Sequence, residues 1–298
     1  MSVHQARQLG REGVGPTELR RLTRDGRLER LRRGAYADPE PFDAVSRHLR
    51  LIAATVPQLR EGAVLSHASA AVIHGLPVPH SLLDRVWVTG RSKGGGHVTT
   101  SLHELKAPLL PGDVIEFGGL NVTSLGRTVV DLGRRLRFDD TVVAADAALH
   151  AGLEQDALSP QLDAWPRRRG IARARKALAI ADGRSESPGE TRSRILMWRL
   201  GLPAPILQYE VRTSGGAFRS DFGWEDRRLL GEFDGRVKYG ELLRPGERPE
   251  DVIMREKRRE QLLRAEGWWV VRWTMADLNN AAGFRRIIET GFANALRA

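Results

Sequence analysis

Residues 218–234 read FRSDFGWEDRRLLGEFD, and the arrangement of the C-terminal third follows from this stretch. Apolar and polar residues alternate at 218–224 and again at 228–234, on both sides of a short charged turn, so we predict two neighbouring β-strands. A further strand is expected just before them at 206–213, joined by the Ser-Gly-Gly turn at 214–216. The sequence therefore predicts a meander of strands.

Helical patterns stand on both sides of this meander. One opens at Glu190 and ends at Gly201, and another covers 249–266 before an apolar strand at 268–273. A polar, linker-like stretch precedes the first helix and places a domain boundary near residue 180. We therefore expect a C-terminal domain at 181–298, built as a sheet flanked by helices.

Acidic residues interrupt the predicted strands at three positions: Asp221, Glu232 and Asp234. Such residues are unusual there, because strands disfavour Asp and Glu. Since side chains alternate along a strand, Glu232 and Asp234 are expected on one face about 7 Å apart, while Phe233 points to a core. The pattern predicts an acidic pocket over the sheet.

The chemistry of such a pocket favours a divalent cation. Close carboxylates repel one another unless a cation neutralises them, and a set of oxygen ligands suits Mg²⁺ or Mn²⁺. The ion lowers the pKa of a bound water and neutralises charge on a phosphodiester during cleavage. The alternative is that these carboxylates face solvent and pair with arginines, for example Arg219 or Arg236.

The first forty residues have the pattern of a DNA-binding module, which we place at 1–40. A helix is predicted from Pro16, ended by Asp25-Gly26, and 27–36 has the pattern of a basic hairpin with a turn at Gly34. A helix followed by a basic β-wing is the layout of a winged helix-turn-helix. The candidate DNA contacts on the helix and the wing are Arg20, Arg21, Arg24, Arg30, Arg32 and Arg33. The alternative is a solvated basic face on a small packing module.

Residues 41–180 predict a mixed α/β domain. Helical patterns occur at 44–59, 65–77 and 128–151, and strand-like patterns occur at 85–89 and 114–123. Three histidines of this region are closely spaced but have no acidic residue beside them, so we do not expect them to bind metal: His67, His74 and His80.

Composition narrows the functional classes. The chain has 298 residues, of which 41% are hydrophobic, so it is long enough for about two domains with real cores. It contains no cysteine, which excludes disulfides, thiolate zinc sites and a cysteine nucleophile. Neither a membrane span nor a signal-peptide core is visible, so a cytoplasmic location is expected.

The formal net charge of +10 favours a polyanionic partner, with nucleic acid, and DNA first, as the natural candidate. The helix predicted at 249–266 also carries a basic face that could follow a nucleic-acid backbone. The candidate DNA contacts on this helix are Arg255, Arg258 and Arg259.

The C-terminal third contains a series of motifs: Ser187-Pro188-Gly189-Glu190, Gly201-Leu202-Pro203, Gln208, Asp221-Phe222, Glu232-Phe233-Asp234-Gly235, Glu256-Lys257-Arg258-Arg259 and Gly267-Trp268-Trp269-Val270-Val271-Arg272. With these motifs, residues 185–280 resemble the very-short-patch-repair-related branch of the restriction-endonuclease-like superfamily.

Three segments of the N-terminal and middle regions carry a second resemblance: 26–38, 66–77 and 123–148. They are similar to the AbiEi-type antitoxins of bacterial type IV toxin-antitoxin systems. This resemblance implies a winged-helix DNA-binding module followed by a mixed α/β domain.

The first resemblance implies roles for particular residues. Asp221 and Glu232 would be the main metal ligands, and Glu190 would add or steer a ligand. Asp234 departs from the family, which has a lysine at that position to stabilise the attacked phosphate or position the water. Lys238 or Lys257 would have to substitute for it, and either is otherwise an ordinary surface lysine.

Two functions follow from these expectations. The first is a Mg²⁺- or Mn²⁺-dependent DNA endonuclease or nickase, with the N-terminal module as its targeting domain. The alternative is a non-catalytic DNA-binding transcriptional regulator or antitoxin, whose last domain is a degenerate nuclease and whose partners include a cognate toxin.

Overall fold

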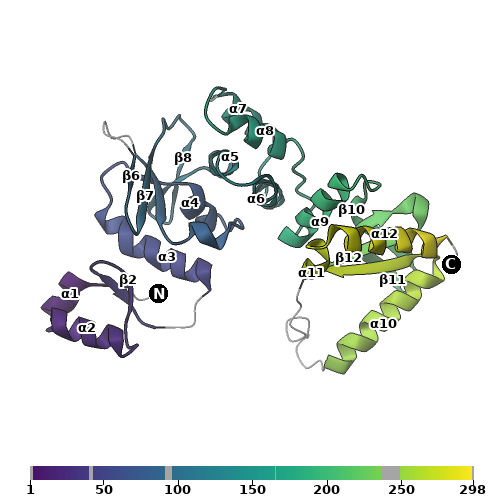
Figure 1. The fold of residues 1–298 in the computed structure, drawn as a ribbon, viewed down its shortest axis with the longest axis horizontal. Helices are drawn as coiled ribbons and strands as arrows, with labels where there is room; N and C mark the ends of the chain where they lie inside the picture. The colour runs from purple at the N-terminus through teal and green to yellow at the C-terminus, as the bar shows by residue number, and fades with distance from the viewer. Residues whose placement is uncertain (1–2, 40–42, 91–95, 165, 236–248, 297–298) are drawn as a thin grey trace. The chain divides into compact units, whose positions relative to one another are not determined.

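The protein is described by a computed structural model that covers residues 3–39, 43–90, 96–164, 166–235 and 249–296, without the side chains of 252 and 253. It divides into two compact units (Figure 1). Unit 1 consists of Met1–Ala148 and Gly152–Ile180, and unit 2 of Leu149–Ala151 and Ala181–Ala298. Helices and mixed sheets occur in the chain together, which confirms the predicted mixed α and β class.

Unit 1 begins with a small helix and strand module. Helices α1 (Ala6–Arg11) and α2 (Pro16–Arg24) precede an antiparallel hairpin of β2 (Glu29–Arg32) and β3 (Ala35–Ala37). Strand β1 (Val3–Gln5) pairs with the other side of β3, giving the order β1-β3-β2. The predicted helix and basic hairpin are confirmed, whereas β1 and α1 were not predicted.

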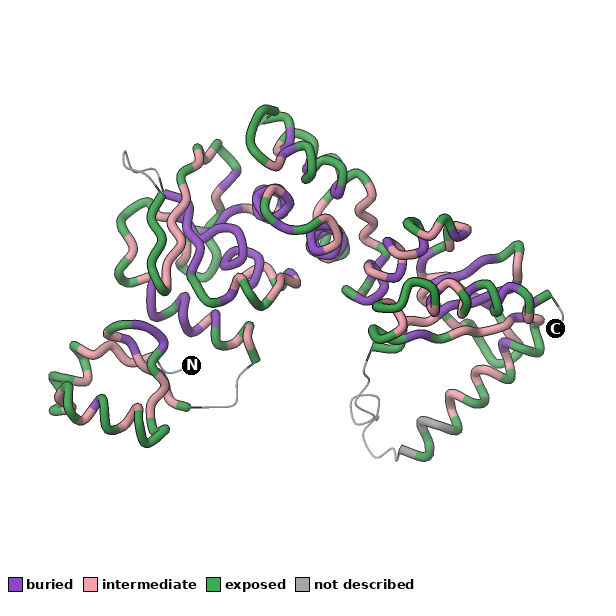
Figure 2. Tube along the Cα trace, viewed as in Figure 1, coloured by how far each residue is buried: buried purple, intermediate pink, exposed green. Residues whose placement is uncertain are grey.

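Local sequence explains the ends of these elements. Pro16 occupies the first turn of α2, where its missing N–H costs nothing. Gly34 makes the hairpin turn at φ +79°, in the left-handed region that glycine adopts without strain. Most residues of α1 and α2 are exposed or half-buried, and Leu19 is the buried anchor of α2 (Figure 2).

The rest of unit 1 is built on a six-stranded mixed sheet with the order β6-β7-β5-β4-β9-β8. The pairs β5·β7 and β4·β9 are parallel, and the others are antiparallel. Its strands are β4 (Val64–Leu65), β5 (Val86–Gly90), β6 (His97–Val98), β7 (Leu102–Lys106), β8 (Val114–Phe117) and β9 (Leu120–Thr123).

Short helices connect and cover this sheet. The predicted long helix at 128–151 is two helices, α5 and α6, and the predicted strand at 114–123 is the hairpin β8–β9. The helical segments are α3 (Ala44–Thr55), η1 (Val56–Gln58), α4 (His67–Ile73), η2 (His80–Leu82), α5 (Leu125–Gly133), α6 (Phe138–His150), η3 (Gln155–Ala157), α7 (Leu158–Asp163) and α8 (Ile171–Leu178).

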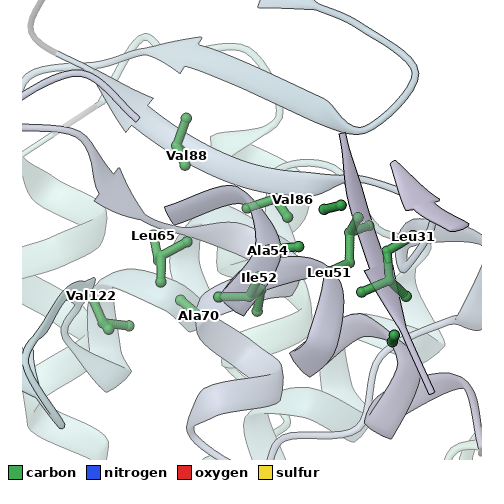
Figure 3. Close-up of a cluster of buried hydrophobic side chains, with 11 residues drawn as sticks. Leu31, Leu51, Ile52, Ala54, Leu65, Ala70, Val86, Val88 and Val122 are labelled. Carbon is green, nitrogen blue, oxygen red and sulfur yellow. The ribbon is translucent and has the colours of Figure 1, made fainter. Parts of the chain in front are cut away.

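The N-terminal module and the six-stranded sheet share one hydrophobic core. Leu31 from the hairpin packs in the same cluster as Leu51 and Ile52 of α3, and Val86 of β5 joins them (Figure 3). Burying a large aliphatic side chain stabilises a fold by about 1.5–3 kcal/mol, so this cluster fixes the hairpin to the sheet. The β2–β3 hairpin is therefore packed into the core of the larger sheet domain.

Unit 2 contains a four-stranded sheet with the order β10-β11-β12-β13. Strands β10 (Ile206–Thr213), β11 (Gly216–Trp224) and β12 (Leu229–Asp234) form the predicted antiparallel meander. Strand β13 (Trp269–Thr274) pairs with β12 in parallel, with α10 (Pro249–Ala265) between them along the chain. This crossover is what a parallel pair requires.

Hydrophobic clusters occupy both faces of this sheet. Leu229 belongs to the cluster that includes the helix residues Met197 and Phe284, and its neighbour Leu230 belongs to the cluster that includes Leu263 of α10. The remaining helical segments of unit 2 are α9 (Pro188–Arg199), η4 (Glu225–Arg227), α11 (Met275–Leu278) and α12 (Ala281–Ala295). Within the described residues, no helix is long and apolar enough to cross a membrane.

Candidate functional site

Helix α2 presents its predicted DNA contacts to solvent. Arg20, Arg21 and Arg24 are all exposed. Arg21 forms an ion pair with Glu18, with 2.7 Å between Nη2 and Oε1, and the Arg24 Nε lies 3.4 Å from the Asp25 carboxylate. Exposed pairs of this kind contribute at most about 1 kcal/mol, so these guanidinium groups are available to phosphates or base edges.

The hairpin divides its three arginines into two roles. Arg30 and Arg33 are exposed, while Arg32 is buried. The Arg32 Nε donates to the Ala54 carbonyl oxygen at 3.0 Å, and its Nη2 donates to the same oxygen. Burial lowers the pKa of Arg32. The Arg32 side chain thus ties the wing to α3, which leaves Arg30 and Arg33 as the exposed wing contacts.

The N-terminus of α9 positions the first predicted acid, Glu190. The Ser187 hydroxyl accepts a hydrogen bond from the Glu190 backbone N–H and caps the helix. Gly189 lies against the ring of Phe233, since a Cβ at this position would stand 1.9 Å from Phe233 Cε1. This contact between Gly189 and the Phe233 ring brings the start of α9 close to β12.

The Glu190 side chain is buried and already hydrogen-bonded. Its Oε2 accepts from Gln208 Nε2 at 2.8 Å and from the Glu186 backbone N–H at 2.9 Å. Gln208 itself has a φ of +53°, a left-handed conformation that costs a non-glycine residue free energy. Gln208 stands opposite Asp221 in the β10–β11 pair, because the residues on either side of Gln208 pair with the neighbours of Asp221.

Asp221 is the most perturbed acid of the group. Burial raises its pKa to about 6, against the opposing effect of the Phe233 N–H, which donates to Oδ2 at 2.8 Å. The charges of Glu190 and Glu232 raise the pKa further. Asp221 therefore holds its proton more readily than an ordinary carboxyl group, which is typical of clustered carboxylates.

Glu232 is paired with arginines. Its Oε1 accepts from Arg259 of α10 and from the Ser220 hydroxyl at 3.2 Å, and its Oε2 accepts from Arg272 of β13 at 2.9 Å. The register places Glu232 directly beside Arg272 in the parallel pair. Burial lowers the pKa of Arg259, but Glu232 and Glu256 outweigh it and the pKa is raised. Two guanidinium groups therefore neutralise this carboxylate.

Several of the remaining predicted residues of unit 2 are exposed. Asp234 is exposed at the end of β12. Lys257 is exposed on α10, two residues from Arg259, and residues two apart on a helix do not share a face. Arg258 is exposed and Arg255 half-buried. Lys238 and Arg236, the other suggested lysine and arginine, lie outside the described residues.

Glu232 pairs with arginines, as the alternative interpretation of the strand acids expected, but its partners are not the arginines suggested from the sequence. Arg219 pairs with Glu186 at 2.8 Å and not with the strand acids. The sequence did not predict Arg272 as a partner of Glu232, and it predicted Arg259 only as a DNA contact. The parallel register of β12 and β13 was the missing information, because it brings Arg272 beside an acid 40 residues earlier.

The arrangement does not fit a bound divalent ion as it stands. Both Glu232 oxygens accept from guanidinium groups, and the Glu190 Oε2 accepts two N–H donors. Among the described residues, no group of three or more histidine, aspartate or glutamate side chains is placed to hold a metal ion. Asp221 remains the acid that a nearby cation would most readily deprotonate.

Two of the three histidines considered above, His67 and His74, have structural partners. His74 Nε2 is hydrogen-bonded to the Thr123 carbonyl oxygen at 2.8 Å, which connects the end of α4 to β9. His67 is hydrogen-bonded to the Ser66 hydroxyl, and burial lowers its pKa to about 4.

Comparison with known proteins identifies the N-terminal module. Residues 6–37 match the family described as "Transcriptional regulator, AbiEi antitoxin". Residues 6–37 are an AbiEi antitoxin-type region. This AbiEi-type region comprises α1, α2 and the β2–β3 hairpin, which carry all six predicted N-terminal arginine contacts.

The chain is also similar to two uncharacterized proteins of Mycobacterium tuberculosis. These are MT2308 of strain CDC 1551 / Oshkosh and Rv2248 of strain ATCC 25618 / H37Rv. Each is 33% identical over 167 residues, which is 55% of this chain and 59% of the relative. The matched region thus spans little more than half of each of these relatives.

Proposed function

We propose that this protein is a DNA-binding transcriptional regulator of the AbiEi antitoxin type, whose C-terminal unit serves as a scaffold without cleaving DNA. The match of residues 6–37 carries the proposal. The net charge of +10 supports it, because arginine contacts with phosphates release counterions. A cognate toxin encoded together with this protein is part of the same proposal.

In this proposal, the exposed arginines of the AbiEi-type region make the contacts with DNA. Arg20 and Arg24 of α2 would face the major groove, while Arg30 and Arg33 of the hairpin would contact the adjacent backbone. Arg32 is buried and holds the hairpin in place. A rigid hairpin suits this role because phosphate contacts fix the register of the helix on DNA.

The test starts from DNA selection with the full-length protein. Random-sequence duplexes retained by the protein are sequenced, and an enriched motif is used for binding curves. Arg20→Ala/Arg24→Ala should weaken binding to the motif by about 5- to 100-fold and flatten its salt dependence. The matched control, Arg60→Ala/Arg212→Ala, removes two exposed arginines outside the region and should bind as the wild type does.

Two outcomes would reject the regulator proposal. One is a selection that enriches no motif over the starting library. The other is equal affinity of the helix variant and the wild type for an enriched motif, since the contacts would then lie elsewhere. Repeating the binding curves in excess chelator separates binding from any metal-dependent step.

The second candidate function is Mg²⁺- or Mn²⁺-dependent cleavage of DNA. The observation that favours it is the raised pKa of Asp221 beside Glu190 and Glu232. The pairing of Glu232 with Arg259 and Arg272 opposes it, because those guanidinium groups already supply the positive charge.

A nicking assay decides between the two candidates. Supercoiled plasmid and single-stranded DNA are incubated with wild type and Asp221→Asn over a titration of Mn²⁺. The scaffold proposal predicts intact DNA with both proteins at all metal concentrations. Nicking by the wild type alone would establish the nuclease and reject the non-catalytic part of our proposal.

A further inference from the structure

An arginine-lined cavity of about 840 Å³ lies in unit 1, away from the AbiEi-type region. It forms where the end of α5 meets residues 166–170 and the first turn of α8. Figure 1 shows α8 at the opposite end of unit 1 from α1 and α2. Its lining contains six arginines and, among the described residues, no acid: Arg134, Arg135, Arg167, Arg168, Arg169 and Arg173.

Contacts with backbone carbonyl oxygens hold the two walls of this cavity together. Gly170 has a φ of +86°, and a Cβ there would stand 2.2 Å from the Arg134 carbonyl oxygen. The same carbonyl oxygen accepts from Arg173 Nη2 at 2.7 Å, and Arg134 Nε donates to the Arg169 carbonyl oxygen at 3.2 Å. The segment that carries the arginines is therefore fixed against α5.

The acids near this cavity are already paired. Asp131 accepts from the buried Arg127 at 2.8 Å and from Arg134 at 3.3 Å. Asp163 pairs with Arg175, which does not line the cavity, at 2.8 Å. Among the described residues, the lining thus carries positive charge without an acid of its own.

Repulsion among the arginines has a visible consequence at Arg135. Burial lowers its pKa, and the charges of Arg134 and Arg169 lower it further against the effect of Asp131. The Arg135 guanidinium also lies over the ring of Trp87, 5.6 Å from the centroid, which holds the side chain near the cavity. A bound anion would relieve this repulsion.

We propose that this cavity binds closely spaced phosphate groups. Guanidinium groups match phosphate oxygens in a two-point geometry, which a single lysine does not provide. The volume lies within the range of about 300–1,000 Å³ typical of small-ligand pockets, so a nucleotide polyphosphate is one source of these phosphates. A nucleic-acid backbone is the other source. The site is built by α5 and α8, so the proposal does not rest on DNA binding by α2.

The test measures binding of inorganic tripolyphosphate to the full-length protein by calorimetry at about 50 mM salt, where charge screening is weak. Arg167→Ser/Arg169→Ser removes two exposed lining arginines whose side chains are not part of the backbone contacts above. The matched control, Arg60→Ser/Lys176→Ser, removes two exposed cations of unit 1 that neither line the cavity nor pair with Asp163.

We expect the lining variant to weaken tripolyphosphate binding by ~10-fold or more, because each guanidinium–phosphate contact is charge-assisted. The control should change affinity by less than ~2-fold, the effect of net charge alone at exposed sites. Equal weakening by both variants would overturn the proposal, and so would a wild type that does not bind tripolyphosphate.

A competition experiment distinguishes the two phosphate sources. ATP and a short random-sequence duplex are each titrated against bound tripolyphosphate, in an Arg20→Ala/Arg24→Ala background that disables the α2 contacts. Displacement by ATP alone supports the proposal with a nucleotide as the source, and displacement by the duplex supports it with a nucleic-acid backbone. Failure of both competitors would overturn it, since neither source would reach the site.

Discussion

The guanidinium of Arg259 on α10 lies directly against the carboxylate of Glu232 on β12, although the two residues are 27 positions apart. The Arg259 side chain is 17% exposed and the Glu232 side chain 15%, so this is not a solvent-screened surface pair. Arg272 completes the arrangement from the neighbouring strand. The sheet thus places two arginine cations against a carboxylate that the sequence predicted as a metal ligand.

Removing Arg259 should destabilise unit 2. Arg259→Ala leaves the partly buried Glu232 with Arg272 as its cation, and we expect a loss of about 1–3 kcal/mol in the free energy of unfolding. Urea unfolding followed by circular dichroism measures it. Arg258→Ala, which removes the exposed neighbour, should change the free energy by less than ~0.5 kcal/mol. Equal effects of the two variants would contradict a stabilising ion pair.

The same substitution should increase affinity for Mn²⁺. Without Arg259, the carboxylates of Asp221, Glu232 and Glu190 lose a neutralising charge, and close carboxylates favour a divalent cation. Calorimetric titration with Mn²⁺ should show tighter binding to Arg259→Ala than to the wild type. Arg258→Ala serves again as the control. A wild type that binds Mn²⁺ as tightly as the variant would show that Arg259 does not replace the ion.

Asp221 should make the stability of the protein pH-dependent. Its pKa rises from 3.8 to about 6 on folding, so between these values the folded state binds more protons than the unfolded state. Stability attributable to Asp221 is therefore greatest below pH 4 and falls as the pH rises to 6, by about 1–3 kcal/mol.

Asp221→Asn isolates this effect. Asparagine keeps an oxygen for the Phe233 N–H but cannot ionise, so the variant should gain stability over the wild type as the pH rises from 4 to 6. Urea unfolding at several pH values gives the difference curve. Asp234→Asn, at the exposed acid of the same strand, is the matched control. A flat difference curve for Asp221→Asn would refute the predicted linkage.

Gly189 should be intolerant of a methyl group. Gly189→Ala places a Cβ 1.9 Å from Phe233 Cε1, which forces α9 and its Glu190 away from the sheet. We expect a loss of about 2–4 kcal/mol, as overpacking and lost contacts combine. The thermal midpoint measures it. Gly235→Ala is the control, because its Cβ would lie at an ordinary 3.6 Å from the same ring. Similar midpoints for the two variants would contradict this close packing.

The adjacent wing arginines should differ in the property they affect. Arg32→Ala removes two donors to the Ala54 carbonyl oxygen and should cost about 1–3 kcal/mol of stability, because that oxygen is left with the Gln5 Nε2 donor at 3.3 Å. Arg33→Ala should leave stability within about 0.5 kcal/mol and weaken DNA binding. Thermal unfolding and binding curves on both variants test the division. The reverse pattern would reject the assignment of Arg32 as a structural residue.

Local patterns in the sequence were enough for several elements. The strand at 206–213 and the start of the helix at Pro249 agree with the structure, and the helix beginning near Glu190 is found at Pro188. Alternation, proline and capping residues act over a few positions, so they are readable without the fold. The segment beyond residue 274 was not assigned, and it forms α11 and α12.

The sequence by itself determined that acids stand inside strands, that the N-terminal hairpin is basic and that the chain is positively charged. Only the tertiary structure decided which cations meet those acids. The parallel register of β12 and β13 pairs Glu232 with Arg272, and the packing of α10 brings in Arg259. The tertiary structure also decided that Arg32 is buried while Arg33 is exposed, and it brought the arginines of the α5–α8 cavity together. These relationships join residues distant in sequence, and strand order and packing, not local propensity, set them.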